Sequence, residues 1–129
     1  MKSFHTTLLC TQLAGLLLAG ALLPGSARAA DGKSVFISEC AECHSATQGK
    51  NKKGPSLFGI VNRPAGTVAD FSGYSAELKV GKRTWDTASL KDFLKKDSKA
   101  TLPNTKMKYE GLEDEKELDA LIAYLNTLH

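Results

Sequence analysis

Two cysteines and a histidine stand together in the pentapeptide Cys40-Ala41-Glu42-Cys43-His44. Two thiols three positions apart, followed directly by an imidazole, are the groups that covalent attachment of a c-type haem requires. On one helical turn both sulfurs can reach the vinyl groups along one porphyrin edge, while the imidazole of His44 is directed at the iron. The motif therefore predicts a haem joined to the chain at Cys40 and Cys43.

Three other interpretations of the cysteine pair are a chance CxxC, a thioredoxin-like redox pair and half of a zinc site. A zinc site needs two more ligands, and the chain beyond its expected leader has no third cysteine. A redox CxxC is expected after a strand in a βαβ pattern, which this sequence lacks. The histidine that follows Cys43 also favours haem over these alternatives.

Residues 1–29 have the parts of a secretory signal peptide in the usual order. These parts are a positive residue, an apolar run of 11 residues, a Pro-Gly break and a small-residue cleavage site: Lys2, Leu13–Leu23, Pro24-Gly25 and Ala27-Arg28-Ala29. The apolar run is shorter than the roughly 20 residues that cross a bilayer as a helix, so a retained anchor is the weaker alternative. We expect cleavage after Ala29, export to the periplasm, loss of Cys10 with the leader, and one mature domain over residues 30–129.

The net charge of the chain is small but unevenly distributed. Without Lys2 and Arg28 of the leader, the 17 basic residues become 15, against 14 acidic residues. This balance argues against a strong general attraction to nucleic acid. Residues 79–110 sum to +5 and residues 111–129 to −4, so basic and acidic side chains are separated along the chain.

The first expected helix follows the N-cap Asp31 and delivers the cysteine–histidine turn at its C-terminal end. Residues 45–72 are rich in Gly, Pro, Asn and Ser and show no periodicity, which predicts a long irregular loop. A second loop is expected over residues 97–111. Long loops are unusual in a compact domain unless they pack on something, and a haem would provide that surface.

Two further helices are expected, and no strand. One follows the N-cap Asp86 and ends near Lys95-Lys96, and the last carries Glu113, Asp114 and Glu115 in its first turn, where the helix dipole favours acidic groups. The apolar residues at helical spacing are Leu90, Phe93 and Leu94, then Leu118, Leu121, Ile122 and Leu125. The last helix must bury its apolar stripe, and we expect it to pack on the first. The predicted fold class is all-α.

A haem that carries electrons without binding small molecules needs a second axial ligand, usually His or Met. Once the leader is removed, His129 and Met107 are the only such residues besides His44. His129 is the last residue, at a helix end that frays easily. Met107 is flanked by Lys106 and Lys108 without apolar periodicity, which argues against a role as core filler. We expect Met107 to be the second ligand, which favours ferrous iron and raises the reduction potential relative to two imidazoles.

Several short motifs follow one another along the mature chain: Phe36, the CAECH turn, Gly54-Pro55, Leu57, Arg63, Tyr74-Ser75, Trp85-Asp86, Pro103–Met107, Gly111-Leu112 and Leu121–Leu125. In this order they resemble the class I cytochromes c, the group of bacterial cytochromes c2 and mitochondrial cytochrome c, over essentially the whole mature sequence. The resemblance implies an all-α class I cytochrome c fold. In that fold the N- and C-terminal helices cross, and long loops wrap around one covalently bound haem.

The resemblance also implies roles for individual side chains. The carbonyl of Pro55 would accept a hydrogen bond from the second ring nitrogen of His44. Arg63, Tyr74 and Trp85 would hydrogen-bond a buried haem propionate, and Thr105 would help to hold the methionine loop. Without the family resemblance, it would be an equally good interpretation that Tyr74 and Trp85 are aromatic residues of the core and that Arg63 is a charged residue of the surface. The residues implied at the crossing of the first and last helices are Gly32, Phe36 and Tyr124.

Four positions depart from the family pattern. Asn62 stands where a Gly commonly precedes the Arg, and Asn104 replaces the Gly after the loop Pro. Both asparagines are compatible with a positive φ. Phe93 replaces a Tyr whose hydroxyl contacts the axial sulfur in many relatives, and Leu78 replaces a frequently polar neighbour of the propionates. We therefore expect a drier haem pocket with an altered reduction potential.

Five lysines are expected near the exposed haem edge: Lys50, Lys52, Lys53, Lys106 and Lys108. Such a patch would steer docking onto acidic surfaces of redox partners, the alternative being a solvated surface without a recognition role.

The function that these features favour is that of a monomeric electron shuttle and not of an enzyme. It would carry electrons from a reductase or dehydrogenase to an oxidase, peroxidase or photosynthetic centre. A haem peroxidase would need an open iron position and a distal acid–base group, for which no spare internal His is present. A subunit bound to one dehydrogenase is the third alternative.

Overall fold

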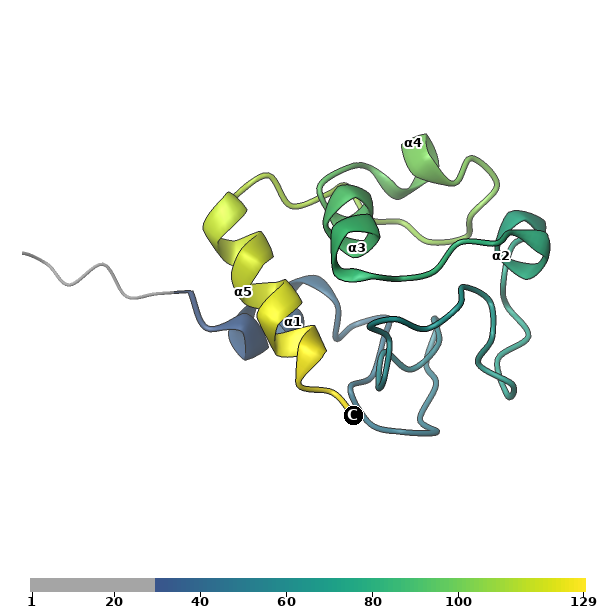
Figure 1. Ribbon diagram of the computed structural model, residues 1–129, viewed down its shortest axis with the longest axis horizontal. Helices are drawn as coiled ribbons and strands as arrows, with labels where there is room; N and C mark the ends of the chain where they lie inside the picture. The colour runs from purple at the N-terminus through teal and green to yellow at the C-terminus, as the bar shows by residue number, and fades with distance from the viewer. Residues whose placement is uncertain (1–29) are drawn as a thin grey trace, which may run out of the picture.

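The computed structural model describes residues 30–129 of the chain. Within this range the helices are α1 (Gly32–Glu39), α2 (Ala76–Val80), α3 (Thr87–Leu94), α4 (Ser98–Thr101) and α5 (Glu115–Asn126). Figure 1 shows α1 and α5 toward one end of the molecule and α2 at the other, with α3, α4 and irregular chain between them. None of these helices is long and apolar enough to cross a membrane. The expected signal peptide and Cys10 lie outside the described residues.

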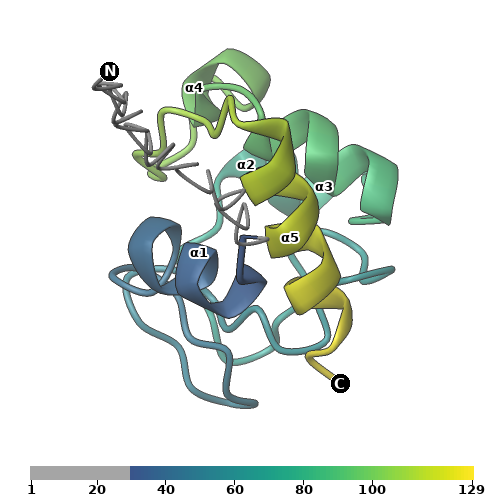
Figure 2. The same ribbon diagram turned by 90° about the vertical axis from the view of Figure 1, so that its left-hand side faces the viewer.

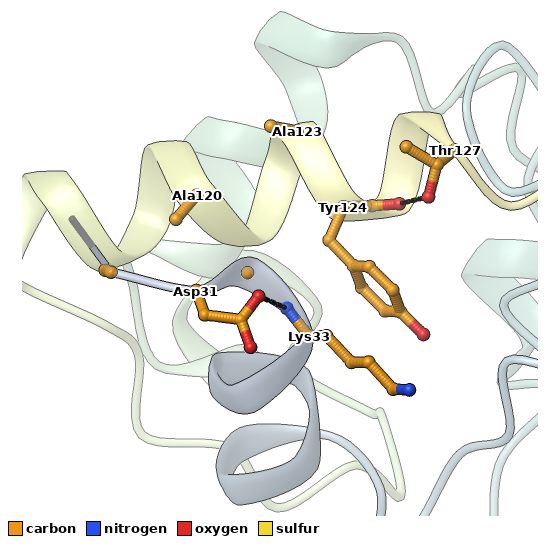
Figure 3. Close-up of a pocket in the computed structure, with 8 residues that line it drawn as sticks. Asp31, Lys33, Ala120, Ala123, Tyr124 and Thr127 are labelled. Carbon is orange, nitrogen blue, oxygen red and sulfur yellow. Dashed lines mark hydrogen bonds between the residues drawn. The ribbon is translucent and has the colours of Figure 1, made fainter. Parts of the chain in front are cut away.

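Helices α1 and α5 cross and pack against each other, as expected, and lie side by side in both views (Figures 1 and 2). The carboxylate of Asp31 caps α1 by accepting a hydrogen bond from the Lys33 amide at 3.3 Å. At Gly32 a Cβ atom would lie 2.7 Å from the Ala120 carbonyl carbon, so only glycine permits this close approach. The rings of Phe36 and Tyr124 pack with centroids 5.4 Å apart. Figure 3 shows the shallow hollow that residues of both helices line at this crossing.

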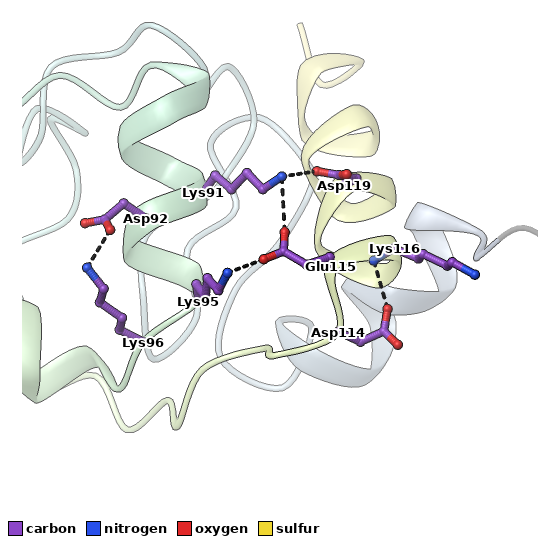
Figure 4. A network of polar contacts seen from close by, with 8 residues as sticks. All are labelled: Lys91, Asp92, Lys95, Lys96, Asp114, Glu115, Lys116 and Asp119. Atoms are coloured by element: carbon purple, nitrogen blue, oxygen red, sulfur yellow. Dashed lines mark hydrogen bonds and ion pairs between the residues drawn. The ribbon is translucent and has the colours of Figure 1, made fainter.

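Helix α3 packs on α5 through the apolar residues that the periodicity predicted, and all of them are buried. Ion pairs join the outer surfaces of the two helices (Figure 4). The ammonium group of Lys91 lies 2.6 Å from Asp119 and 3.3 Å from Glu115, and Lys95 also pairs with Glu115. Hydrogen bonds from Lys95 and Lys91 hold the pKa of Glu115 below its ordinary value. Two of the acidic side chains of α5, Glu115 and Asp119, are therefore paired with a lysine of α3 and the lysine that follows it.

The predicted loop over residues 45–72 is irregular, and residues 62–65 within it are held by a short antiparallel pairing with residues 83–85. The Asn62 amide donates to the Trp85 carbonyl, and the Trp85 amide donates to the Arg63 carbonyl, both at 2.9 Å. Asn62 has φ 63°, and among the described residues it is the only non-glycine with a positive φ. The left-handed backbone that both asparagine substitutions allow is thus used at Asn62 and not at Asn104.

The structure differs from the sequence-based expectation at three places. Helices α2 and α4 were not predicted, because elements of 5 and 4 residues are too short to show helical periodicity. The last helix begins at Glu115, so Glu113 and Asp114 precede its first turn. Asp114 acts instead as the N-cap, its carboxylate accepting hydrogen bonds from the amides of Lys116 and Glu117 at 2.8 and 3.0 Å. An N-cap side chain satisfies amides that the helix itself leaves free.

Candidate haem-binding site

The cysteine–histidine turn continues directly from the C-terminal end of α1. The Cys40 amide donates to the Phe36 carbonyl at 2.9 Å, and the His44 amide donates to the Cys40 carbonyl at 2.8 Å. Both cysteines are free thiols, Cys40 buried and Cys43 half-buried. Burial raises the pKa of Cys40 to about 12, so its sulfur is held as a thiol. The turn therefore presents two unpaired sulfurs and one imidazole within five residues.

The imidazole of His44 is fixed by a backbone carbonyl from the following loop. Its Nδ1 lies 2.8 Å from the carbonyl oxygen of Pro55, the contact that the family resemblance implies. A carbonyl oxygen only accepts hydrogen bonds, so Nδ1 carries the proton and Nε2 keeps a free lone pair. Burial lowers the pKa of His44 and favours the neutral ring. A neutral imidazole with one free nitrogen is the form that binds a metal ion.

Backbone pairing between the turn and the loop decides where Pro55 lies. The Gly54 amide donates to the Cys43 carbonyl and the Leu57 amide donates to the Ser45 carbonyl, both at 2.8 Å. The loop therefore runs close beside the imidazole face. A Cβ atom at Gly54 would lie 2.7 Å from Nδ1 and 2.9 Å from Nε2 of His44, so the ring occupies the space that a side chain would need.

Met107 lies in a loop that α4 holds from one side. The side chain of Met107 is half-buried and packs against the hydrophobic core. The Thr105 hydroxyl accepts a hydrogen bond from the Met107 amide at 3.1 Å, and the Ser98 hydroxyl donates to the Met107 carbonyl at 3.0 Å. Ser98 also accepts from the Tyr109 amide at 3.2 Å and is fully buried. Ser98 was missed from the sequence, because nothing in the order of residues distinguishes it from an ordinary loop serine.

Arg63, Tyr74 and Trp85 are brought to one region of the fold, but their polar atoms have different partners. The guanidinium of Arg63 donates to the carbonyls of Phe58 and Ser56 at 2.8 and 3.0 Å. The Tyr74 hydroxyl accepts from the Val68 amide at 3.2 Å. Burial lowers the pKa of Arg63, and the adjacent Tyr74 opposes this shift. Trp85 is buried, with Arg83 above its ring at 5.2 Å.

Two of the four residues that depart from the family pattern, Phe93 and Leu78, are apolar and pack in or against the core. Phe93 is 5% exposed, and its ring centroid lies 5.1 Å from that of Trp85. Leu78 is half-buried against the same core. Tyr109, which was not singled out from the sequence, is 9% exposed, and within residues 30–129 its hydroxyl oxygen is buried without a hydrogen-bond partner. Its pKa is raised, first by burial and then by the neighbouring Cys40.

The lysines expected at the haem edge are all exposed, but they differ in what they contact. The ammonium group of Lys53 pairs with Glu42 at 2.6 Å. That of Lys52 donates to the Ala41 carbonyl. Both therefore turn back onto the cysteine–histidine turn, whereas Lys106 and Lys108 flank Met107 on the exposed side of its loop. The positive charge near the turn is smaller than a count of lysines suggests.

Comparison with known proteins shows the family to which the chain belongs. The sequence profile described as Cytochrome c matches residues 29–129. The chain belongs to the cytochrome c family. Cytochrome c-550 of Bradyrhizobium diazoefficiens is 41% identical over 99 residues, which cover 76% of this chain and 71% of that protein. Cytochrome c2 iso-2 of Magnetospirillum molischianum is 42% identical over 89 residues, covering 69% of this chain and 90% of that protein.

A solved structure shows the same fold. Cytochrome cH from Methylobacterium extorquens matches with a TM-score of 0.66 and 43% sequence identity, covering 74% of this chain and 94% of that one. The class I cytochrome c fold predicted from the sequence is thereby confirmed. Membership of this family supports haem-based electron transfer as the general function. The described residues fit a c-type haem, because two unpaired thiols, an oriented neutral imidazole and a buried phenol without a partner lie in one region.

Proposed function

We propose that this cytochrome c is a periplasmic carrier of single electrons, with one haem c joined to Cys40 and Cys43 and ligated by His44 and Met107. The observation that carries the proposal is the 2.8 Å contact between His44 Nδ1 and the Pro55 carbonyl, which leaves Nε2 free to bind iron. The bound haem would supply an iron that alternates between the ferric and ferrous states. The chain itself would hold that group, set its ligands and exclude water from it.

Each candidate residue has a defined task in this proposal. Cys40 and Cys43 would form the two thioether bonds, and Pro55 would keep the imidazole in one orientation and raise its basicity. Thr105 holds the amide of Met107 and would keep the thioether directed at the iron. Arg63, Tyr74 and Trp85 would stabilise a propionate, the first two by exchanging present hydrogen-bond partners for its oxygens.

A redox titration of the purified protein, followed by absorption spectra, tests this proposal. We expect one haem per chain, a low-spin iron and the near-infrared band of sulfur-to-iron ligation in the ferric form. Met107→Ala should abolish that band and lower the reduction potential, because a thioether ligand favours ferrous iron. His129→Ala is the matched control, since it removes the other candidate ligand. A Met107→Ala spectrum identical to that of the wild-type protein would exclude methionine ligation.

The proposed partners are proteins with acidic docking surfaces. Donors would be a reductase or dehydrogenase, and acceptors an oxidase, peroxidase or reaction centre, each meeting a monomer at its lysine-rich face. Electron-transfer rates should fall with rising ionic strength, because exposed charges are screened beyond about 10 Å at 0.1 M salt. Lys106→Gln and Lys108→Gln should reduce that dependence more than Lys53→Gln, since Lys53 already pairs with Glu42. Rates that do not change with salt would leave the lysines without a docking role.

The proposed location is the periplasm, with residues 1–29 removed as a signal peptide and residues 30–129 forming the mature domain. The cytochrome c-550 and cytochrome c2 relatives from bacteria support this location. Mass spectrometry of the protein from a periplasmic fraction should give a chain that begins at Ala30 and carries one haem. A chain that retains residues 1–29 in the membrane fraction would contradict the proposal.

A further inference from the structure

One hydrogen bond joins the methionine loop to a distant part of the chain. The side-chain amide of Asn104 donates to the carboxylate of Glu77 in α2, 27 residues earlier. Among the hydrogen bonds of the described residues, it is the only one that links residues 103–108 to a segment outside residues 98–111. The remaining bonds of the loop, including those of Ser98, are made within that segment.

Helix α2 has only 5 residues, none of them fully buried, and it is held by its contacts with the 45–72 loop. At Gly66 a Cβ atom would lie 2.8 Å from the Leu78 carbonyl carbon, so α2 packs directly on the backbone of the 45–72 loop. Tyr74, which precedes α2, is tied to the same loop through Val68 at 3.2 Å. Glu77 is half-buried, and the Oε2 atom of its carboxylate is shielded from solvent. Its carboxylate is therefore placed by the fold rather than free to rotate in water.

The charge of Glu77 strengthens the contact. The hydrogen bond from Asn104 is the main cause that lowers the pKa of Glu77, so the carboxylate is ionised at neutral pH. A bond to an ionised acceptor is stronger than one between neutral groups. Asn104 stands where the family pattern has a glycine, which has no side chain for this bond. The Asn104 side chain thus supplies a contact that a glycine at this position could not make.

We infer that Glu77 is a positioning residue for Met107: through Asn104 it fastens the far side of the methionine loop to α2 and keeps the thioether in place. The inference depends on the proposed role of Met107 as an iron ligand. The loop is held at two sides, by Ser98 within its own segment and by Glu77 across the fold. Loss of the second fastening should let the loop open more often without unfolding the protein.

The test uses the haem-loaded ferric protein and cyanide, which binds the iron when the methionine leaves. Glu77→Ala and Asn104→Ala should each speed cyanide binding about tenfold or more, the factor that one net hydrogen bond to a charged group represents. The double variant should be no faster than either single one, because both remove the same contact. Glu77→Gln, which keeps an acceptor oxygen but not the charge, should give a rate between those of the wild type and Glu77→Ala. Glu110→Ala is the matched control, an exposed carboxylate in the same loop.

Hydrogen–deuterium exchange separates this inference from the proposed function. The amides of Thr105 and Met107 should exchange faster in Glu77→Ala and Asn104→Ala, whatever group ligates the iron. A wild-type protein without the sulfur-to-iron band would refute methionine ligation. Hydrogen–deuterium exchange of the loop amides would still measure whether the bond between Asn104 and Glu77 holds the loop. Unchanged cyanide rates and unchanged exchange in both single variants would overturn the inference. So would a double variant whose rate is the product of the two single effects.

Discussion

Replacing Gly32 by alanine tests whether the crossing of α1 and α5 needs the closest possible approach of two backbones. The new Cβ atom would lie 2.7 Å from the carbonyl carbon of Ala120 and 2.8 Å from Cβ of Tyr124. Carbon atoms pack best at about 3.5–4.0 Å, so the two helices would have to separate by about 1 Å. The obstructing atoms belong to helix backbone and to a Cβ, which no rotamer change can move away.

The expected cost follows from two opposing effects. Overpacking of a well-packed core costs about 1–3 kcal/mol, and the upper value applies here because the backbone cannot yield. Alanine gains about 0.5–1 kcal/mol over glycine in the middle of a helix, and the lower value applies here because Gly32 is the first residue of α1. The net destabilisation is therefore about 2.5 kcal/mol, together with a wider separation of the Phe36 and Tyr124 rings. With an m-value of about 3 kcal/mol/M, the midpoint of unfolding in guanidinium chloride should fall by about 0.8 M.

Equilibrium unfolding of the haem-loaded protein, followed by tryptophan fluorescence and by haem absorption, measures this change. Gly49→Ala is a matched control, because no heavy atom lies within 4 Å of the added Cβ and only the left-handed backbone, φ 67°, is penalised. We expect Gly49→Ala to cost about 1 kcal/mol or slightly more. A Gly32→Ala protein as stable as the wild type would refute the steric account of the crossing.

Three further predictions concern the site and the surface. Gly54→Ala should displace His44 from Pro55 and weaken iron ligation, seen as a shifted haem spectrum and a lower yield of haem-loaded protein; an unchanged spectrum would contradict the fit of the ring. Ser98→Ala should cost about 1–3 kcal/mol in the free energy of unfolding and weaken the sulfur-to-iron band, because it leaves the Met107 carbonyl and the Tyr109 amide without their buried partner. Hydrogen bonds from Lys95 and Lys91 lower the pKa of Glu115, so the ionised carboxylate stabilises the folded protein. This stabilisation is fully present above the ordinary pKa of 4.5 and is lost as the pH falls through the lower pKa of the folded state. In thermal unfolding, Glu115→Gln should therefore be less stable than the wild type at pH 7, and this difference should shrink as the pH falls below 4.5. A difference that stays constant as the pH falls would count against the ion pairs.

Much of the fold could be predicted from local patterns. The helix starts at Asp31 and Asp86 and the apolar stripes of α3 and α5 lie where capping and periodicity indicate, because these signals depend only on neighbouring residues. The pairing of α1 with α5 was expected from an unpartnered stripe and from the family resemblance. Helices α2 and α4 escaped prediction, since elements this short are stabilised by what they touch rather than by their own sequence.

The candidate site divides in the same way. The cysteine–histidine turn and the shortlist of axial ligands can be read from residue types, because few residues bind haem iron. Other contacts of the site depend on how the loops fold. Arg63 and Tyr74 bond to residues 5 and 6 positions earlier, and Asn104 bonds to Glu77, which lies 27 positions earlier. The burial of Ser98 likewise depends on the folded loop. No local pattern encodes those distances.

The sequence by itself predicted the chemistry, since two thiols and an imidazole at this spacing are the groups that covalent attachment of a c-type haem requires. Only the tertiary structure decided how these groups are held. The carbonyl that orients His44 and the carboxylate that fastens the methionine loop come from segments distant in the chain. The same holds for charge, because two acidic side chains of α5, Glu115 and Asp119, pair with Lys91 and Lys95. Residue types fix what can react, whereas packing fixes which groups meet.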